Sequence, residues 1–206
     1  MGIITTIEAQ GKHVVVYVDG SAFVKLSKDE FEKLPLREGE EVEEAAYLDR
    51  LCALQGPKAY EAALKMLGRR DMTAGEMRAA LRRKNVAAPL VESTVARLTE
   101  NRLIDDARYA GRFVELRANA MAGRYAVRQK LKAKGVGDEA IEATLAALSD
   151  EQQIAAAKAL AARLIRRYQG QEARAVRAKL SQALARRGFS WDVISGALEG
   201  LSTEEW

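Results

Sequence analysis

Hydrophobic residues form short runs at the start of the chain and a helical pattern in the rest. Residues 3–7, 13–18 and 22–26 are rich in β-branched and aromatic residues, which favour strands. Asp19-Gly20 separates the last two runs, and both residue types accept the positive φ angles of a two-residue hairpin turn. The first part of the chain is therefore predicted to contain a β-hairpin.

A short helix is predicted to follow the hairpin. Ser27 and Glu30 are spaced as in a capping box, in which the Ser hydroxyl accepts from a backbone N–H and the Glu carboxylate reaches back. The helix should end near Pro35, and residues 37–40 should form a turn. A helix or an extended linker then leads to the predicted boundary at residues 56–57.

The remainder of the chain repeats itself. Leu-Arg-Arg-Lys-Asn-Val at residues 81–86 is echoed by Leu-Lys-Ala-Lys-Gly-Val at 131–136 and by Leu-Ala-Arg-Arg-Gly-Phe at 184–189. Apolar residues keep this register on both sides of the repeated segment. The corresponding positions are Met77, Val127 and Leu180; Val91, Ile141 and Ile194; Val95, Leu145 and Leu198; and Leu98, Leu148 and Leu201. Such a repeat indicates stacked copies of one supersecondary unit.

Each copy is predicted to contain three helices, because apolar residues follow the 3.6-residue period of half-buried helices. Thr73 and Glu76 are spaced as a second capping box. The second helices should end at residues that tolerate the left-handed conformation, and the third helices should begin at helix-start residue types. The end residues are Asn85, Gly135 and Gly188, and the start residues are Pro89, Asp138 and Ser190. We therefore expect about nine helices in this part of the chain.

The predicted fold is mainly α: a tandem array of three three-helix repeats, preceded by a small β-containing region. The N-terminal region of hairpin and helix is expected to span residues 1–56. The three repeats are expected to span residues 57–104, 105–152 and 153–206.

Residue content disfavours several classes of function. Cys52 is the only cysteine and His13 the only histidine, so a disulfide framework, a zinc site and Cys-His or Ser-His-Asp catalysis are not expected. The sequence has no glycine-rich phosphate loop, no secretory signal and no apolar stretch near the roughly 20 residues that span a membrane. We expect a cytoplasmic monomer that is not an enzyme, contacts no membrane and needs no cofactor or metal.

Charge divides the chain in the same place as the hydrophobic pattern. Residues 1–56 carry 6 Lys/Arg and 11 Asp/Glu, a net charge of −5, whereas residues 57–206 carry 27 and 18, a net charge of +9. Cations gather on the second helices, where Arg124, Arg128 and Lys132 are aligned on one face by their i, i+4, i+8 spacing. The candidate contact residues are Arg78, Arg82, Arg83 and Lys84; Arg124, Arg128, Lys130, Lys132 and Lys134; and Arg174, Arg177, Lys179, Arg186 and Arg187.

Two interpretations of these cations are open. Charges opposite an apolar stripe are usually a solvated face, and a cation in the last turn of a helix contributes about 0.3–1 kcal/mol of stability. Three aligned cations without acids between them repel by a few tenths of a kcal/mol per pair, however, so a partner that supplies negative charge explains them better. Nucleic-acid phosphates or acidic protein side chains would do so.

Aromatic residues are few and most lie at apolar helix positions. Tyr60, Tyr109, Phe113 and Phe189 are interpreted as core residues, and Trp191 is expected to be half exposed at a helix start. We therefore predict contact with phosphates or a protein surface, with little recognition of bases.

Residues 98–110, Leu-Thr-Glu-Asn-Arg-Leu-Ile-Asp-Asp-Ala-Arg-Tyr-Ala, resemble the signature of the RecX family, in which a Leu-Ile-Asp-Asp segment joins the first helical unit to the second. The resemblance covers about residues 57–201, and the preceding region is similar to the N-terminal extension of longer members. The motif residues here are Leu103, Ile104, Asp105, Asp106 and Tyr109.

The motif is expected to have a structural role. Asp105 or Asp106 is placed to cap the next helix, and Arg102 or Arg108 to pair with these acids. The family usually has Gly where this chain has Arg102, so Asn101 is expected to adopt the left-handed conformation instead. Two adjacent carboxylates without a metal cluster or a His partner do not form a hydrolytic site.

The resemblance implies a regulator of the RecA recombinase. RecX-like proteins lie in the helical groove of the RecA–DNA filament and inhibit ATP hydrolysis, strand exchange and the coprotease activity. The implied partners are the RecA filament and single- and double-stranded DNA, the DNA contacted through phosphates. Rigid repeated units that touch several RecA subunits would add weak contacts through effective concentration.

Three other functions stay open at this stage. The first is a sequence-specific DNA-binding regulator of helix-turn-helix type, although the second helices offer mainly Lys and Arg for reading bases. A helical scaffold for another protein is the second, and its binding would not respond to salt. An enzyme is the third. The charge asymmetry also suggests the hypothesis that the acidic N-terminal region inhibits the basic repeats.

Overall fold

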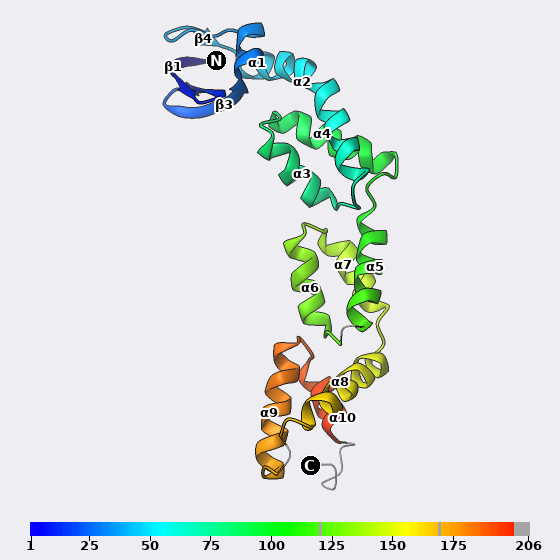
Figure 1. Ribbon diagram of the computed structural model, residues 1–206. Helices are drawn as coiled ribbons and strands as arrows, with labels where there is room; N and C mark the ends of the chain where they lie inside the picture. The colour runs from blue at the N-terminus through cyan, green and yellow to red at the C-terminus, as the bar shows by residue number, and fades with distance from the viewer. Residues whose placement is uncertain (120, 169, 200–206) are drawn as a thin grey trace. The chain divides into compact units, whose positions relative to one another are not determined.

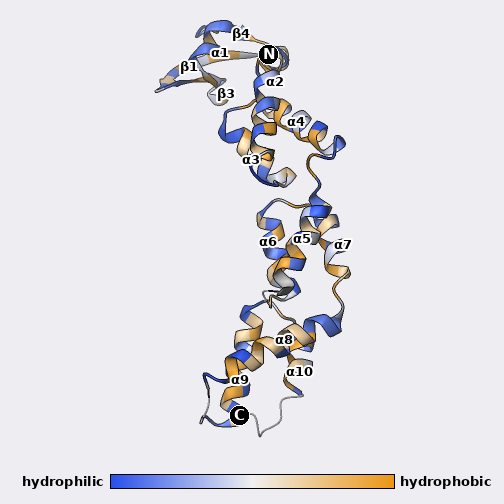
Figure 2. Ribbon diagram, turned by 45° about the vertical axis from the view of Figure 1, so that its right-hand side comes forward, coloured by the Kyte–Doolittle hydropathy of each residue, from blue (hydrophilic) through white to orange (hydrophobic). Residues whose placement is uncertain are grey.

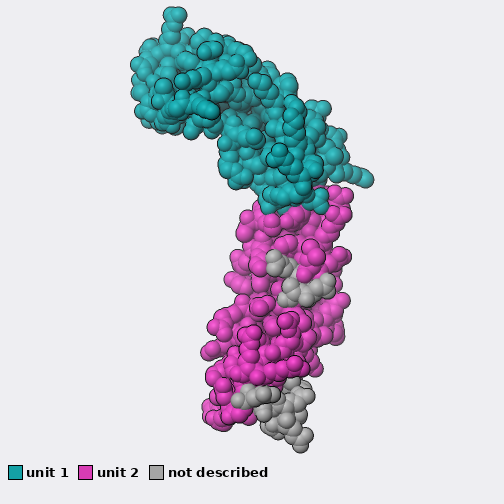
Figure 3. Space-filling model, in the orientation of Figure 1, with its two compact units in different colours: residues 1–104 teal, residues 105–206 magenta. Residues whose placement is uncertain are grey.

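The computed structural model describes residues 1–119, 121–168 and 170–199, which belong to two compact units. Unit 1 contains residues 1–104 and unit 2 contains residues 105–206 (Figure 3). The described residues form ten helices and one four-stranded sheet, which confirms the predicted mainly helical fold with a β-containing N-terminal region. Nine of these helices make up three three-helix groups, α2–α4, α5–α7 and α8–α10 (Figure 1).

The sheet of unit 1 is antiparallel, with the strand order β3-β2-β1-β4. Its strands are β1 (Gly2–Gln10), β2 (His13–Val18), β3 (Ser21–Ser27) and β4 (Glu41–Val42). The predicted hairpin turn is confirmed, since Asp19 and Gly20 have φ angles of 49° and 80°. A second hairpin turns at Gly11, with a φ of 62°, and was not predicted because β1 extends beyond its apolar run.

The first helix, α1 (Lys28–Lys33), begins at the predicted capping box. The Glu30 N–H donates to Ser27 Oγ at 3.3 Å, and the Ser27 N–H donates to Glu30 Oε2 at 2.7 Å. The chain then turns through Gly39, whose φ is 81°, before it enters β4. The turn predicted over residues 37–40 is thereby confirmed.

Helix α2 (Glu44–Leu67) continues through Pro57, so the prediction that a helix or linker ends there is wrong. A proline inside a helix removes a backbone hydrogen bond and costs about 3 kcal/mol. Packing on both sides of the proline offsets this cost, because Tyr47 and Leu51 pack on the sheet and Ala63 packs in the core with α3 and α4. The division of the chain into four regions at residues 56, 104 and 152 stays a prediction.

Helices α3 (Ala74–Arg83) and α4 (Ala88–Glu100) complete the first group. The capping box of Thr73 and Glu76 is confirmed, and Pro89 lies in the first turn of α4 as expected. Met77, Leu81 and Val91 are completely buried between the helices.

Unit 2 contains two three-helix groups, each with its own core. The helices are α5 (Asp106–Asn119), α6 (Arg124–Ala133), α7 (Asp138–Ala146), α8 (Asp150–Ile165), α9 (Ala173–Arg186) and α10 (Trp191–Glu199). Hydrophobic and hydrophilic residues share each of these helices, as expected of half-buried helices (Figure 2). The repeat-equivalent residues Val127, Leu131 and Ile141 centre the second group, and Leu180, Leu184 and Ile194 centre the third. Leu201, the last of the predicted apolar positions, lies outside the described residues.

The predicted left-handed residues are confirmed at the ends of all three second helices. Asn85, Gly135 and Gly188 have φ angles of 59°, 72° and 83°. In each case two backbone hydrogen bonds close the last turn, as in the Schellman motif. After α6, for example, the Gly135 N–H donates to Lys132 O at 2.8 Å and the Val136 N–H donates to Leu131 O at 3.2 Å.

The same motif closes α4, but one residue later than expected. Asn101 has a φ of −78° and Arg102 a φ of 56°, so the prediction of a left-handed Asn101 is wrong. The Arg102 N–H donates to Thr99 O and the Leu103 N–H to Leu98 O, both at 2.9 Å. These bonds require the positive φ at position 102, whichever residue stands there.

Two glycines bring the second and third groups into backbone contact. The Gly123 N–H donates to Arg187 O at 2.9 Å, and the Tyr125 N–H donates to Gly188 O at 3.1 Å. A Cβ on Gly123 would overlap the carbonyl of Gly188, and one on Gly188 would overlap the backbone of Ala126. The start of α6 and the end of α9 therefore approach more closely than side chains would allow (Figure 1).

We expect Gly123→Ala to lower the free energy of unfolding by about 1–3 kcal/mol, because the new methyl group must push the Gly188 carbonyl away. Urea unfolding of the full chain measures this change. Gly137→Ala is the matched control, since Gly137 is also a helix N-cap with extended backbone but has open space around its Cβ position. Equal losses in the two variants would show that the glycine contact contributes nothing.

Arg102→Gly is expected to raise the free energy of unfolding by about 0.5–1 kcal/mol, since glycine adopts the left-handed conformation without the strain of a side chain. Thermal unfolding at neutral pH measures it. Asn101→Gly, one residue earlier in the right-handed region, should instead lower stability by about 0.5–1 kcal/mol. A stabilising Asn101→Gly or a destabilising Arg102→Gly would contradict the assignment of the left-handed residue.

Candidate polyanion-binding surfaces

Arginines of α3 are paired with an acid of the next helix. Arg78 Nε lies 2.7 Å from Glu92 Oε2, and Arg82 Nη2 lies 3.0 Å from Glu92 Oε1. Hydrogen bonding from Arg78, and then the charges of both arginines, hold the pKa of the Glu92 carboxyl below its usual value of 4.5. These two cations therefore have a structural partner inside their own three-helix group.

The aligned cations of α6 are also paired internally. Arg128 Nη2 lies 2.6 Å from Glu142 Oε2, and Lys132 Nζ lies 2.9 Å from Asp138 Oδ1. Arg124 also has partners, which are Asp150 and the carbonyl oxygen of Leu148.

These pairs correct the premise that the aligned cations have no acids near them, on which the preference for an external partner was based. Repulsion within the stripe is relieved by acids from α7 and from the start of α8. The spacing of residues along one helix does not reveal these acids, because they lie on neighbouring helices. A detectable signal exists nevertheless, because Arg78–Glu92 and Arg128–Glu142 have the same spacing along the chain and occupy equivalent repeat positions.

The third group lacks this ion pair. The positions equivalent to Arg128 and Glu142 are Ser181 and Ser195, whose hydroxyls donate to Arg177 O and to Glu199. Within the part of the chain that the structure describes, none of the candidate cations of α9 and its C-cap is in an ion pair, and all are exposed. They are Arg174, Arg177, Lys179, Arg186 and Arg187; we call this set the α9 cations.

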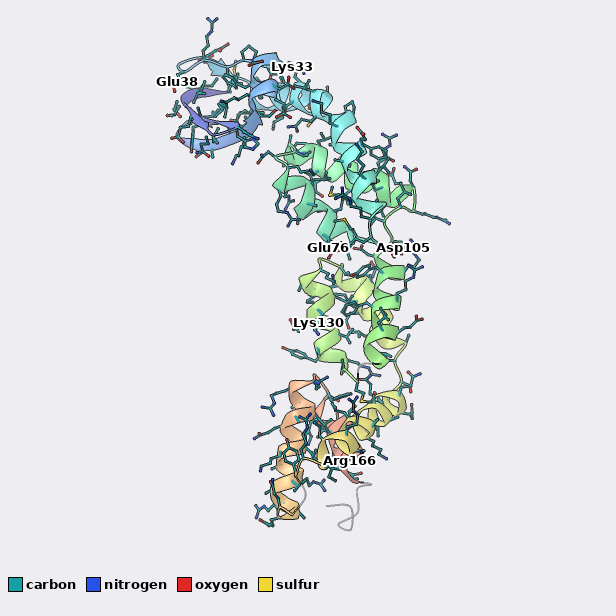
Figure 4. The ribbon with its side chains drawn as sticks, in the orientation of Figure 1. Lys33, Glu38, Glu76, Asp105, Lys130 and Arg166 are labelled. Carbon is teal, nitrogen blue, oxygen red and sulfur yellow. The ribbon has the colours of Figure 1, made fainter. Side chains whose placement is uncertain are left out.

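The remaining candidate cations are either exposed without an ion pair or in contact with a tyrosine ring. Arg83, Lys84 and Lys130 are exposed and form no ion pair with another described residue, and Lys130 lies on α6 (Figure 4). Lys134 Nζ lies 5.6 Å from the centre of the Tyr109 ring, a cation–π contact. Among the α9 cations, Lys179 Nζ donates to Gln171 Oε1 at 2.5 Å and lies 5.5 Å from the centre of the Tyr168 ring.

The Leu-Ile-Asp-Asp motif lies around the start of α5. Of its two acids, Asp105 provides the cap, since its Oδ1 accepts from the Arg108 N–H at 2.8 Å, and Asp106 is the first residue of α5 (Figure 4). Ile104 is 2% exposed and packs in the core of the first group, whereas Leu103 is 45% exposed. Tyr109 stacks on Phe113 with ring centres 6.4 Å apart.

Gln55 is a buried polar residue that sequence reasoning missed. Its Nε2 donates to Glu30 Oε1 at 2.9 Å and to Asn85 O at 3.2 Å, and its Oε1 accepts from the Ala87 N–H at 2.8 Å. The amide thereby ties α2 to α1 and to the loop after α3. Glutamine is usually an exposed residue, so no local pattern marks this position for burial.

The single histidine and the single cysteine of the chain are not placed for catalysis or metal binding. His13 Nδ1 lies 3.5 Å from Asn85 Nδ2, and burial raises the pKa of the Cys52 thiol, which makes it a poor nucleophile near neutral pH. In the described ranges, no three His, Cys, Asp or Glu side chains gather into a metal-binding group. The helices described also include none that is long and apolar enough to cross a membrane.

The pKa of Glu92 leads to a prediction about acid stability. Because the folded-state pKa is lowered, the stabilisation by its arginines is present above about pH 4.5 and is lost as the pH falls through the folded-state pKa. We expect Glu92→Gln to remove about 0.5 kcal/mol of stability near pH 7, a magnitude typical of surface pairs, and less at about pH 3. Urea unfolding at the two pH values measures the difference.

Glu100→Gln is the matched control for this experiment. Glu100 is exposed on the same helix, and no ion pair joins it to another described residue. Its replacement should leave the difference between the two pH values unchanged, and a Glu92→Gln variant that behaves in the same way would show that the arginine pairs contribute no stability.

Comparisons with known proteins agree on one family. Models of the first, second and third three-helix domains of RecX match residues 59–98, 105–145 and 150–198. The "Regulatory protein RecX" of Levilactobacillus brevis is 32% identical over 100% of this chain and 80% of its own length. That of Geobacillus thermodenitrificans is 29% identical, over 93% of this chain and 72% of its own length.

Two solved structures extend the agreement to the fold. A crystal structure of regulatory protein RecX is 30% identical with a TM-score of 0.67, and covers 97% of this chain and 100% of its own. A crystal structure of RecX from Lactobacillus salivarius is 28% identical with a TM-score of 0.68, covering 71% of this chain and 96% of its own. With its three matched helical domains and its 32% identity to the relative from Levilactobacillus brevis, the chain belongs to the RecX family of regulatory proteins.

Proposed function

We propose that this chain binds the RecA–DNA filament and lowers the ATPase, strand-exchange and coprotease activities of RecA. The observation that carries the proposal is the set of α9 cations, which are exposed and, among the described residues, without ion-pair partners. Uncompensated arginines and lysines on one helix attract phosphates or acidic side chains, and both are present on a filament of protein and DNA. Membership of a family of regulatory proteins supports the same conclusion.

The paired cations of α3 and α6 have a secondary role in this proposal. An exposed ion pair contributes only about 0–1 kcal/mol, so Arg78 or Arg128 can exchange its acid for a phosphate at small cost. Such an exchange gains little, because the acid left behind repels the phosphate. The α9 cations are therefore proposed to supply most of the electrostatic attraction.

The test is an ATPase titration of RecA on single-stranded DNA. The wild-type chain is expected to inhibit hydrolysis at stoichiometric amounts and low salt, whereas the triple variant Arg174→Glu, Arg177→Glu, Arg186→Glu should need about tenfold more protein, as the loss of a few phosphate contacts predicts. Raising the salt concentration should weaken the wild type more than the variant.

The matched control reverses three exposed charges elsewhere. Lys12→Glu, Lys25→Glu and Lys28→Glu change the net charge by the same amount in the N-terminal region. This variant should inhibit RecA as the wild type does. Equal weakening in both variants would assign the effect to net charge alone, and a wild-type chain without influence on RecA would refute the proposed function.

A further inference from the structure

Two aromatic side chains in unit 2 are strongly exposed. Tyr125 on α6 is 63% exposed and Trp191 at the start of α10 is 73% exposed. The aromatic residues that were expected in the cores, Tyr60, Tyr109, Phe113 and Phe189, do pack there. Trp191 is more exposed than the half exposure expected from the sequence. The sequence pattern gives no expectation for the exposure of Tyr125.

The backbone brings these two residues into the same neighbourhood. The Tyr125 N–H donates to Gly188 O, and Trp191 follows Gly188 by three residues. Phe189, which follows Gly188 in the chain, is 5% exposed and packs the segment between Gly188 and Trp191 into the core of the third group. The close approach of Gly123 and Gly188 brings together the two backbone segments that carry the exposed rings.

Two of the α9 cations lie at the same junction. Arg187 O accepts from the Gly123 N–H at 2.9 Å, and Arg186 is the last residue of α9. Both arginines are exposed, and no ion pair joins either to another described residue. We call Tyr125, Arg186, Arg187 and Trp191 the junction patch.

The rings of the junction patch differ from other aromatic rings beside cations in this chain. Arg97 lies 4.3 Å from the ring centre of Tyr60, and a lysine is stacked in this way on Tyr109 and on Tyr168. Across the described residues, no such cation–π contact covers Tyr125 or Trp191. Their faces are open to a planar ligand, while the neighbouring guanidinium groups are open to an anion.

We propose that the junction patch binds single-stranded nucleic acid, with bases stacked on Tyr125 and Trp191 and phosphates contacted by Arg186 and Arg187. Exposed aromatic rings beside uncompensated arginines are the combination that binds unpaired bases, because every base has a flat π-face and every linkage a phosphate. A duplex hides its base faces within the stack and offers only phosphates. This inference rests on the proposed function in assuming that the chain contacts DNA, and it replaces the expectation of contact with little involvement of bases.

The test measures binding of dye-labelled oligonucleotides by fluorescence anisotropy. Trp191→Ala and Tyr125→Ala should each weaken binding to a single-stranded oligothymidylate by about 5–30-fold, as expected for the loss of one stacked base. Binding to an abasic oligonucleotide of equal length and to a duplex should change less than about twofold, since stacking contributes to neither. Trp191→Phe should keep most of the affinity because phenylalanine retains a flat ring.

Leu116→Ala is the matched control, since Leu116 is 69% exposed on α5 of the same unit and has no aromatic ring. Equal affinity of the wild type, Trp191→Ala and Tyr125→Ala for oligothymidylate would overturn the inference. An equal loss for the abasic strand would also overturn it, because the rings would then act through folding and not through stacking.

The inference can fail alone or together with the proposed function, and the two cases give different results. If the aromatic variants lose inhibition of the RecA ATPase but bind oligothymidylate as the wild type does, the rings contact protein and the inference is wrong, although the proposed function stands. If the wild-type chain neither binds an oligonucleotide nor affects RecA, both are wrong.

Discussion

The three-helix groups depend on one backbone device, the left-handed residue that ends each second helix. It lets two N–H groups reach back to the carbonyls of the last turn and directs the chain toward the third helix. The residue that follows it is apolar and packs back on the core, as Val136 does beside Leu131. The repeated sequence of a leucine, a cation, a left-handed residue and an apolar residue is therefore the sequence of this device.

The same device explains one set of cations without reference to a partner. Lys84, Lys134 and Arg187 are the C-cap residues that precede the three left-handed positions. A cation at this place stabilises the negative end of a helix by about 0.3–1 kcal/mol. Their equivalence among the repeats is thus accounted for by helix stability, and a binding role for any of them is additional.

The features of the fold that could be predicted are local in the sequence. Capping boxes, hairpin turns and left-handed stops each involve residues within a few positions, so Ser27, Asn85 and Gly188 could be assigned from residue type. Pro57 and Gln55 could not, because both are tolerated only through contacts with distant segments. Pro57 stays within helix α2 because the sheet packs against one half of this helix and the α3–α4 pair packs against the other. Gln55 is buried because three separate groups form hydrogen bonds with its amide.

The candidate surface shows the same limit. The helical period correctly predicts that Arg124, Arg128 and Lys132 lie on one face of α6. It contains no information about the acids of the neighbouring helices, with which these cations pair. Within the sequence, only a comparison of the repeats indicates which cations have an acidic partner. The second group pairs Arg128 with Glu142, whereas the third group has two serines at these positions. A surface predicted from one helix therefore identifies where cations lie and not which of them are compensated.

Whether a cation is paired with an acid determines the distance over which its charge acts. A paired arginine and glutamate form a dipole whose field falls off quickly, whereas an uncompensated cation acts over about the Debye length, which is roughly 8 Å at physiological salt. On this basis the α9 cations, and not the paired residues of α3 and α6, would steer the chain toward a polyanion. Steering alone would not distinguish one polyanion from another. That distinction requires contacts of shorter range, and we propose that the exposed rings of Tyr125 and Trp191, at the junction that carries Arg186 and Arg187, provide them.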